Sequence, residues 1–318
     1  MKLLVTGGAG FIGSSLVDRL LALGHDVTCL DNFDGYYEPA SKQENLAAAS
    51  RSPRFHLAEG DIGDEALLDR LLVDRPEVVV HLAARAGVRP SIADPALYER
   101  VNVQGTITLL EACRRHAVPY AVFASSSSVY GVSRDIPFQE DSSRLIPASP
   151  YGVTKLAGEL FCRTYHDLYG IPITCLRFFT VYGPRQRPDM AIHRFVRLTE
   201  DGQPLPVYGD GTARRDFTYI DDVVDGVVRA IERPRGFQIY NLGTHETVAL
   251  QDLVAAIERA VGKKAAIARQ PVQPGDVPVT YADITRAARD LGYAPSTRID
   301  EGIPKFVDWF RRTRAARI

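Results

Sequence analysis

Tyr151 and Lys155 are the pair of residues with the clearest chemical use in the sequence. In a helix, residues spaced by four lie one turn apart on the same face. The lysine ammonium group would then lower the pKa of the phenol, because a nearby positive charge favours the ionised form. A phenol tuned in this way can act as a general base toward an alcohol. The same spacing is common on amphipathic helices, so this interpretation depends on a cofactor site and a substrate site elsewhere in the chain.

The N-terminus predicts the cofactor site. Residues 2–6 have the composition of a buried strand, Gly7, Gly10 and Gly13 follow it, and residues 14–23 have helical spacing. In the βαβ dinucleotide-binding fingerprint the first glycine allows a tight turn, the second lets the pyrophosphate approach the backbone, and the third lets the helix pack closely on the strand. The pyrophosphate would then lie at the positive end of the helix.

Asp31 indicates which dinucleotide binds. It ends a second predicted strand over residues 26–31, where a carboxylate can accept hydrogen bonds from the adenosine ribose hydroxyls. A carboxylate at this position would also repel a 2′-phosphate. NAD is therefore the predicted cofactor, in preference to NADP.

Strand and helix patterns continue to alternate along the chain. Near-continuous apolar runs such as residues 77–82 are typical of parallel strands that are covered on both faces. The alternation predicts an α/β fold with a Rossmann-type doubly wound parallel sheet. The remaining predicted strands cover residues 54–59, 120–124, 171–176 and 238–242. The remaining predicted helices of this part cover residues 66–73, 95–116 and 151–169.

The pattern changes after about residue 180. Residues 1–180 are predicted as the NAD-binding Rossmann domain, and residues 181–318 as a smaller, mixed α/β lobe that binds the substrate. This lobe begins with a stretch rich in proline and glycine, as loops often are. The strand at 238–242 indicates that the chain returns to the sheet at about 216–243, so the two parts are interleaved. The short helices predicted after residue 180 cover residues 221–231, 250–261, 284–291 and 300–312.

Composition excludes several classes of function. The 318 residues include 38 Lys and Arg and 39 Asp and Glu, so no overall charge attracts nucleic acid or an anionic membrane. The 4 cysteines lie apart in apolar runs, as expected of core residues in a reducing compartment, and the 7 histidines lack ligand spacing, so no metal site is predicted. No apolar run approaches a membrane span, and the first strand begins too early for a signal peptide. A cytoplasmic protein is expected.

Four serines, Ser125 to Ser128, directly follow the strand predicted over residues 120–124. Because ligands of such sheets bind at the carboxyl ends of the strands, these hydroxyls would lie at the mouth of the cofactor cleft. A hydroxyl there can bond to a substrate alcohol and share its proton with Tyr151. A serine-rich turn without a function has the same composition, so this prediction also depends on its context.

Six motifs together resemble the extended short-chain dehydrogenase/reductase family, which includes the nucleotide-sugar epimerases and dehydratases. The motifs are T-G-G-A-G-F-I-G at 6–13, D-N at 31–32, G-D-I at 60–62, H-L-A-A at 81–84, S-S-S-S-V-Y-G at 125–131 and Y-G-V-T-K at 151–155. The resemblance implies a catalytic triad of Ser126, Tyr151 and Lys155, with Ser127 or Ser128 as alternatives for the serine. It also implies NAD binding by Gly7, Gly10, Phe11, Ile12, Gly13, Asp31, Asn32, Asp61, Ile62, Ala83, Asn102, Tyr151, Lys155 and Phe179.

The residues just before Val129 indicate which reaction to expect. Sugar 4,6-dehydratases of this family carry an Asp-Glu pair there, and its UDP-glucuronate decarboxylases carry a Glu, whereas this chain has Ser127 and Ser128. Elimination of water needs an acid for the leaving hydroxyl and a base for the carbon-bound proton. Serine hydroxyls supply neither at neutral pH. The resemblance therefore implies an NAD-dependent nucleotide-sugar 4-epimerase, an isomerase that passes through a 4-keto intermediate.

Segments 31–39, 86–91 and 177–191 are more similar to UDP-glucuronate 4-epimerases than to UDP-glucose 4-epimerases. The expected reaction is therefore the conversion of UDP-glucuronate to UDP-galacturonate. A hexuronate carries a carboxylate, which hydroxyl, backbone N–H and guanidinium groups can bind. The predicted partners of this carboxylate are Thr180, Arg185 and Arg89, and Arg187 is left open as a ligand or a surface residue.

The same resemblance predicts the rest of the substrate site. Residues 205–211 and 214–219 match the family's uridine and diphosphate site, and residues 273–278 match a later loop. Arg215 is the predicted diphosphate cation, and Asp276 a predicted ribose contact. The further residues assigned to the UDP-sugar are Ser127, Ser128, Val207 and Tyr208.

Two other functions stay open. A UDP-glucose or UDP-N-acetylglucosamine 4-epimerase would turn over neutral sugars. A non-catalytic NAD-binding scaffold or sensor would have no need of Ser126, Tyr151 and Lys155 together. Because the family commonly dimerises through two long helices, here residues 95–116 and 151–169, a homodimer is expected.

Overall fold

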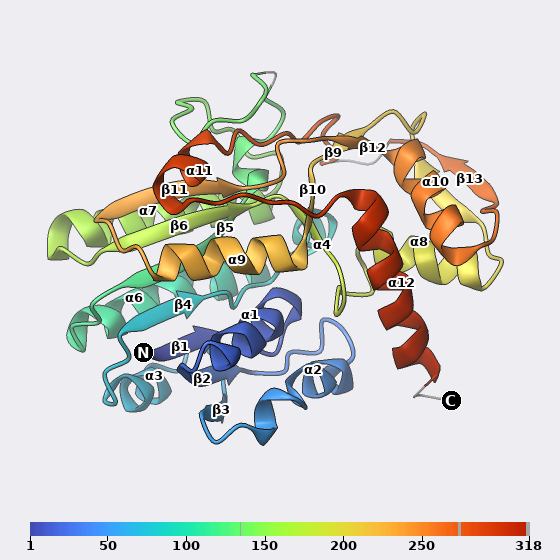
Figure 1. Cartoon of the computed structure of the whole chain (residues 1–318). Coiled ribbons are helices and arrows are strands. Elements are labelled where there is room, and N and C mark those ends of the chain that lie inside the picture. Colours follow the sequence, from blue (N-terminus) through green and yellow to red (C-terminus); the bar gives the residue numbers. More distant parts are fainter. Residues whose placement is uncertain (134, 273–274, 316–318) are drawn as a thin grey trace.

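The computed structural model describes residues 1–133, 135–272 and 275–315. Its centre is a seven-stranded sheet in the order β11-β6-β5-β4-β1-β2-β3, with every pair parallel (Figure 1). The chain adds β2 and β3 on one side of β1 and then crosses to place β4 on the other side. This reversal of direction defines a doubly wound sheet, so the predicted Rossmann-type fold is confirmed. The strands are β1 (Lys2–Thr6), β2 (Asp26–Asp31), β3 (Phe55–Glu59), β4 (Val78–His81), β5 (Ala121–Ser126), β6 (Ile173–Phe178) and β11 (Phe237–Leu242).

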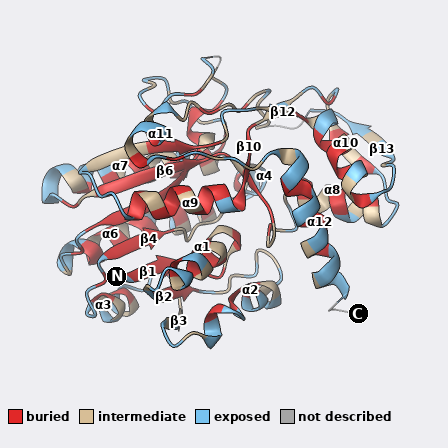
Figure 2. Ribbon diagram, viewed as in Figure 1, coloured by how far each residue is buried: buried red, intermediate tan, exposed pale blue. Residues whose placement is uncertain are grey.

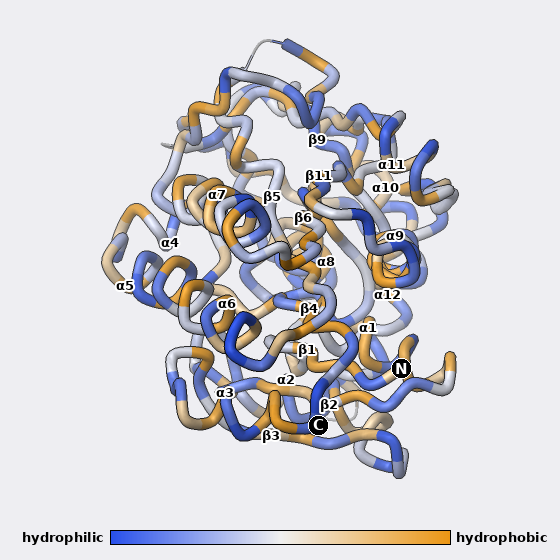
Figure 3. The backbone as a smooth tube through the Cα atoms, turned by 90° about the vertical axis from the view of Figure 1, so that its left-hand side faces the viewer, coloured by the Kyte–Doolittle hydropathy of each residue, from blue (hydrophilic) through white to orange (hydrophobic). Residues whose placement is uncertain are grey.

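Helices cover both faces of this sheet. Figure 3 shows α1 and α9 on one side and α3, α6 and α7 on the other. Neighbouring strand residues point to opposite faces, so Leu3 and Val5 belong to the core under α1 and α9, whereas Leu4 belongs to the core under α3 and α6. Burial on both faces explains why these strands are apolar without alternation. The helices are α1 (Phe11–Ala22), α3 (Glu65–Leu72), α6 (Gly105–Arg115), α7 (Pro150–Tyr169) and α9 (Ile220–Ile231).

The helix predicted over residues 95–116 is interrupted. It consists of α5 (Pro95–Glu99), a π-helical turn (Arg100–Gln104) and α6. The turn holds the Asn102 amide between two neighbours, because its Nδ2 donates to the Arg85 carbonyl at 2.9 Å and to the Thr154 hydroxyl at 3.0 Å. Such π-helical turns are frequent near functional sites, and this one connects α6, α7 and the loop after β4.

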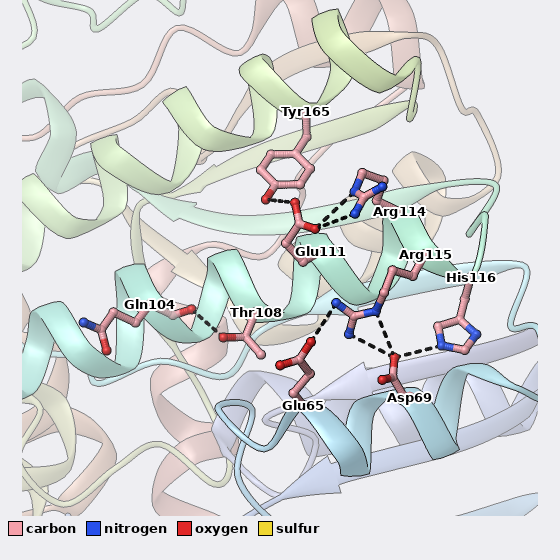
Figure 4. Close-up of polar contacts among 9 residues, drawn as sticks. All are labelled: Glu65, Asp69, Gln104, Thr108, Glu111, Arg114, Arg115, His116 and Tyr165. Atoms are coloured by element: carbon pink, nitrogen blue, oxygen red, sulfur yellow. Dashed lines mark hydrogen bonds and ion pairs between the residues drawn. The ribbon is translucent and has the colours of Figure 1, made fainter.

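Helix α6 is fixed on both sides by polar contacts (Figure 4). On the α7 side, Glu111 accepts hydrogen bonds from the Tyr165 hydroxyl at 2.6 Å and from Arg114. On the α3 side, Asp69 accepts hydrogen bonds from Arg115 and pairs with His116. These contacts keep the outer surface of α6 and α7 in one arrangement.

Part of the chain after residue 180 builds a smaller assembly beside the carboxyl edge of the sheet, at the right of Figure 1. Helix α10 packs against α8 and α12, and the faces of these helices that meet are buried (Figure 2). The chain also returns to the large sheet, since β11 pairs with β6. The helices of this assembly are α8 (Ala191–Glu200), α10 (Leu250–Val261) and α12 (Ile299–Ala315). Helix α11 (Thr285–Leu291) lies against β11 and α9 of the large sheet. Short strand pairs are β7 (Thr180–Tyr182) with β10 (Phe217–Tyr219), β8 (Leu205–Tyr208) with β13 (Ile267–Gln270), and β9 (Arg214–Arg215) with β12 (Val248–Ala249).

Candidate active site

A cavity of about 440 Å³ lies at the carboxyl edge of the sheet, where the strand order reverses between β1 and β4. Ligands of doubly wound folds bind at this position. Its lining includes residues from the turns that follow β1, β2, β3, β4, β5 and β6, and Tyr151 and Lys155 on α7. The two residues singled out by their spacing therefore face the predicted cofactor cleft.

The glycine turn after β1 leaves room for a dinucleotide. Gly7 has φ +70°, and a Cβ atom there would lie 2.6 Å from the backbone nitrogen of Ala83. A Cβ atom on Gly13 would collide with the Gly7 carbonyl oxygen. Helix α1 begins at Phe11 without a side-chain cap, so its first N–H groups are available at the cavity. These are the features that a pyrophosphate needs, and the residues present fit NAD.

Asp31 lies nearly buried at the far end of the cavity from Tyr151. Its Oδ2 accepts a hydrogen bond from the Ala9 N–H at 3.1 Å, and its Oδ1 accepts one from the Phe33 N–H at 2.9 Å. Asn32 donates to Asp61 at 2.7 Å, which joins two more of the predicted cofactor residues. All predicted cofactor-binding residues line the cavity except Asn102, which lies behind the lining and holds the Arg85 backbone.

Ser126 is the serine placed to act on Tyr151. Strand β5 runs two residues further than predicted and ends at Ser126, after which Ser127–Tyr130 form a 3-10 turn. The Ser126 hydroxyl accepts a hydrogen bond from the Ser128 N–H at 3.1 Å, which fixes its position. Burial raises the pKa of Tyr151, whereas a hydrogen bond with Ser126 and the charge of Arg187 lower it.

Lys155 is buried in α7 and contacts the strand that carries Ser126. Its Nζ donates to the Ala124 carbonyl oxygen at 2.8 Å and lies 5.2 Å from the centre of the Phe123 ring. Burial lowers the pKa of Lys155 to about 8. The positive charge that lowers the pKa of Tyr151 is that of Arg187. Here Lys155 holds the end of β5, the strand that carries Ser126.

Thr180, Ser127 and Ser128 line the cavity together with Tyr151. Arg187 also lines it, and its charge acts on Tyr151. Two bonds to Asp189 orient the Arg187 guanidinium, with Nε at 3.0 Å from Oδ1 and Nη2 at 3.2 Å from Oδ2. The Tyr36 hydroxyl also donates to Asp189, at 3.1 Å.

Arg185 lies elsewhere. Its Nη2 pairs with Asp18 of α1 at 2.7 Å, and it is not part of the cavity lining. The structure thus brings Arg187, rather than Arg185, to Tyr151. The two arginines are separated by one residue, and Arg185 has φ +69°, a backbone conformation that the sequence did not reveal.

A second group of predicted substrate residues gathers beyond the cavity. Arg89 pairs with Asp276 at 3.0 Å and lies 4.4 Å from the centre of the Tyr208 ring. Burial lowers the pKa of Arg215, which also feels the charge of Asp276. The Val207 side chain is buried in β8. Arg89 is therefore placed with the predicted nucleotide residues and not beside Thr180.

A small cavity of about 50 Å³ lies next to the large one. The two cavities share Val88, Ser127 and Ser128, and the small one continues to Gly275 and Thr280. It therefore extends the lining from Ser127 and Ser128 toward the loop that carries Asp276. Residues 273 and 274 of the predicted loop lie outside the described residues.

The lining residues without a role predicted from the sequence include Tyr36, Tyr37 and Lys42. The segment at 31–39 stands out only by its similarity, and a tyrosine pair followed by a lysine five residues later has no fixed meaning by spacing. Within the described parts of the chain, no group of three or more His, Cys, Asp or Glu could hold a metal ion. Across residues 1–133, 135–272 and 275–315, every helix is too short or too polar to span a bilayer.

Comparison with known proteins agrees with this site. A model of the NAD dependent epimerase/dehydratase family matches residues 3–243. The UDP-glucuronate 4-epimerase of Thermodesulfobacterium geofontis is 40% identical, over 96% of this chain and 95% of that protein. UDP-glucuronic acid 4-epimerase from Bacillus cereus, solved in complex with UDP-glucuronic acid and NAD, has a TM-score of 0.94 and 41% identity, over 98% of this chain and 100% of that chain. UDP-glucose 4-epimerase from Thermotoga maritima, solved with UDP-glucose, has a TM-score of 0.91 and 33% identity, over 99% and 100%.

Proposed function

The chain belongs to the NAD dependent epimerase/dehydratase family, and we propose that it interconverts UDP-glucuronate and UDP-galacturonate by NAD-dependent 4-epimerisation. The observation that carries the proposal is the set of side chains around Tyr151. Ser126, Ser127, Ser128 and Thr180 supply hydroxyls and Arg187 a cation. This set can bind a carboxylate, and it offers no second acid for dehydration.

Tyr151 acts as the base in this proposal. It removes the proton of the sugar 4-hydroxyl and later returns the same proton, and Ser126 holds the phenol and the hydroxyl together. Bound NAD supplies a reversible acceptor for the hydride of carbon 4. Ser126 and Arg187 both favour the ionised phenol, which opposes the effect of burial.

Arg187 also protects the intermediate. A 4-keto-hexuronate is a β-keto acid and can lose its carboxylate as carbon dioxide. Arg187 and the Thr180 hydroxyl lie where they can bind this carboxylate in its charged form and restrict its rotation. The proposed protein therefore releases an epimer and little decarboxylated product.

Proton NMR of UDP-glucuronate incubated with the holoenzyme tests the function directly. Epimerisation changes the coupling of the proton at sugar carbon 4, because the 4-hydroxyl moves from equatorial to axial. Turnover of UDP-glucose or UDP-N-acetylglucosamine but not UDP-glucuronate would favour the neutral-sugar alternative. Tight binding of NAD without turnover of any UDP-sugar would favour a scaffold or sensor.

Replacing Arg187 with leucine is expected to raise KM for UDP-glucuronate roughly tenfold to a hundredfold, because a charge-assisted hydrogen bond is lost. Decarboxylated product should increase at the same time, as measured by release of carbon dioxide. An Arg185→Leu variant tests the alternative made from the sequence. A larger loss in that variant, with wild-type kinetics for Arg187→Leu, would assign the carboxylate to Arg185.

We also propose that the protein is a homodimer formed through α6 and α7. Val153 and Leu160 are two turns apart on one face of α7 and are 54% and 62% exposed. The polar contacts of Figure 4 keep α7 fixed against α6. Exposed apolar residues on a rigid surface favour association.

The dimer predicts that Leu160→Glu gives a monomer in light scattering coupled to gel filtration, since an unpaired carboxylate would be buried at the interface. Leu23→Glu is the matched control, because Leu23 is also exposed but lies at the end of α1, on the other side of the sheet. Equal masses for the wild type and Leu160→Glu would exclude this interface.

A further inference from the structure

Lys42 lies at the end of the cavity that holds Asp31. Its Nζ is 3.3 Å from Asp31 Oδ1, and the two side chains are only 10% and 5% exposed. Both residues line the cavity. Lysine is rarely buried this far without a partner, and a charged pair at a cofactor site can determine which ligand fits.

Helix α2 (Pro39–Leu46) places Lys42 there. The Asn45 side chain, on the same face of the helix, donates a hydrogen bond from Nδ2 to the Ala9 carbonyl oxygen at 3.1 Å. Ala9 belongs to the glycine turn, so α2 is fixed to the backbone that is expected to receive the pyrophosphate. Lys42 is therefore held against the cofactor site and is not a mobile surface lysine.

Asp31 neutralises this lysine. One oxygen of the carboxylate faces Lys42 and the Phe33 N–H, and the other accepts from the Ala9 N–H. A carboxylate at the end of the second strand accepts hydrogen bonds from the ribose hydroxyls of NAD. With Asp31 present, the pair of Asp31 and Lys42 has no net charge and does not attract a 2′-phosphate.

Tyr37 supplies an independent observation. Its hydroxyl is buried and has no hydrogen-bond partner among the described residues, although Tyr37 lines the cavity. Burial raises its pKa to about 12, with Arg187, Asp31 and Asp189 as the charges that act on it. The hydroxyl thus keeps its proton at neutral pH and can donate a hydrogen bond. A buried unpaired donor destabilises a protein unless a ligand accepts its hydrogen bond.

We propose that Lys42 and Tyr37 are cofactor-binding residues of this chain, and that Asp31 keeps the site selective for NAD by neutralising Lys42. Tyr37 would donate its phenolic hydrogen to the bound cofactor. Lys42 is a latent phosphate-binding residue, which becomes available to the 2′-phosphate of NADP when Asp31 loses its charge. The inference rests on the NAD site of the proposed function, and it is independent of the sugar.

The test of Asp31 and Lys42 measures bound nucleotide. It does not depend on turnover of a UDP-sugar, so a negative result can be distinguished from failure of the epimerase assay. Purified Asp31→Asn and Asp31→Ser are incubated with equal concentrations of NAD and NADP, freed of unbound nucleotide, denatured and analysed by chromatography. The ratio of NADP to NAD is expected to rise roughly tenfold to a hundredfold over the wild type in both variants. The double variant Asp31→Asn/Lys42→Met should lose most of this gain.

Lys264→Met is the matched control for the loss of a lysine, because its side chain is 91% exposed. It should leave the nucleotide ratio unchanged. Equal NADP uptake with and without Lys42 would show that another group receives the phosphate and would overturn the role of Lys42. Continued exclusion of NADP by folded Asp31→Asn and Asp31→Ser would overturn the role of Asp31.

Tyr37→Phe tests the second residue and keeps the ring. Release of NAD, followed as exchange with labelled NAD, should become roughly threefold to tenfold faster because one hydrogen bond is lost. The nucleotide-free variant should unfold at the same or a higher temperature than the nucleotide-free wild type, because an unpaired buried hydroxyl has been removed. An exchange rate equal to that of the wild type would exclude contact between Tyr37 and the cofactor. Tyr169→Phe, at a residue that is 49% exposed on α7, is the control.

Discussion

Replacing Tyr151 with phenylalanine is expected to lower kcat for UDP-glucuronate roughly a hundredfold to ten-thousandfold, the range for loss of a general base. The ring stays in place, with its edge-to-face contact to Tyr98 at 6.3 Å. NAD and substrate should therefore still bind. The decrease in kcat is measured at saturating substrate, with reactions of the wild type and the variant stopped at fixed times and analysed by NMR.

Tyr98→Phe is the control for this variant. It removes a neighbouring phenolic hydroxyl, which donates to the Ala86 carbonyl oxygen and not to the cavity. We expect its kcat to stay within a few-fold of the wild type, since one structural hydrogen bond contributes about 1 kcal/mol. A Tyr151→Phe enzyme with more than a tenth of wild-type kcat would require another base.

The pH dependence of kcat reports on the ionisation of Tyr151. A base must lose its proton to act, so activity should rise with pH through the pKa of Tyr151. A hydrogen bond with Ser126 lowers this pKa. Ser126→Ala should therefore shift the rising limb of the profile to higher pH. A shift to lower pH would contradict the contact between Ser126 and Tyr151.

Replacing Arg177 with methionine is expected to destabilise the protein by about 3–5 kcal/mol, because it leaves a buried carboxylate unpaired. Arg177 and Glu159 have side chains only 1% and 3% exposed and form two bonds of 2.8 Å. Arg177 also donates to the Tyr130 hydroxyl at 2.8 Å. Urea unfolding gives the change in free energy.

The double variant Arg177→Met/Glu159→Leu tests whether the lost stability comes from the unpaired carboxylate. Apolar replacement of both partners of a buried ion pair is often neutral or stabilising, so most of the lost stability should return. Arg163→Met is the surface control, because its pair with Asp167 has side chains 58% and 50% exposed, and it should change stability by less than about 1 kcal/mol. A double variant as unstable as Arg177→Met would show that the hydrogen bond to Tyr130 dominates.

The sequence was sufficient for the sheet and for the cofactor end of the site. Strands buried on both faces have a distinctive apolar composition, and the glycine turn is local, so both can be predicted from neighbouring residues. The carboxyl ends of parallel strands share one edge. This brings Ser126 near Tyr151, although the two residues belong to different elements and are not neighbours in the chain.

The residues around the proposed sugar site could not be predicted as fully as those of the cofactor site. Whether Arg185 or Arg187 faces the cavity depends on the φ of Arg185 and on partners far away in sequence, Asp18 for one and Tyr36 for the other. Helical spacing alone predicts that Lys155 acts on Tyr151. Spacing does not reveal that its ammonium also reaches the Ala124 carbonyl, a partner that only the packing of α7 on β5 provides.

The return of the chain to the sheet limits how this enzyme can be divided or recombined. All six residues of β6 are buried, and β11 pairs with its outer side. A fragment that ends at residue 180 would expose β6 as a long apolar edge, which promotes aggregation. Exchange of the whole substrate-binding part between relatives would have to carry β11 with it. New sugar preferences are therefore expected to arise by substitution in loops such as 183–190, with the covalent order of the chain unchanged.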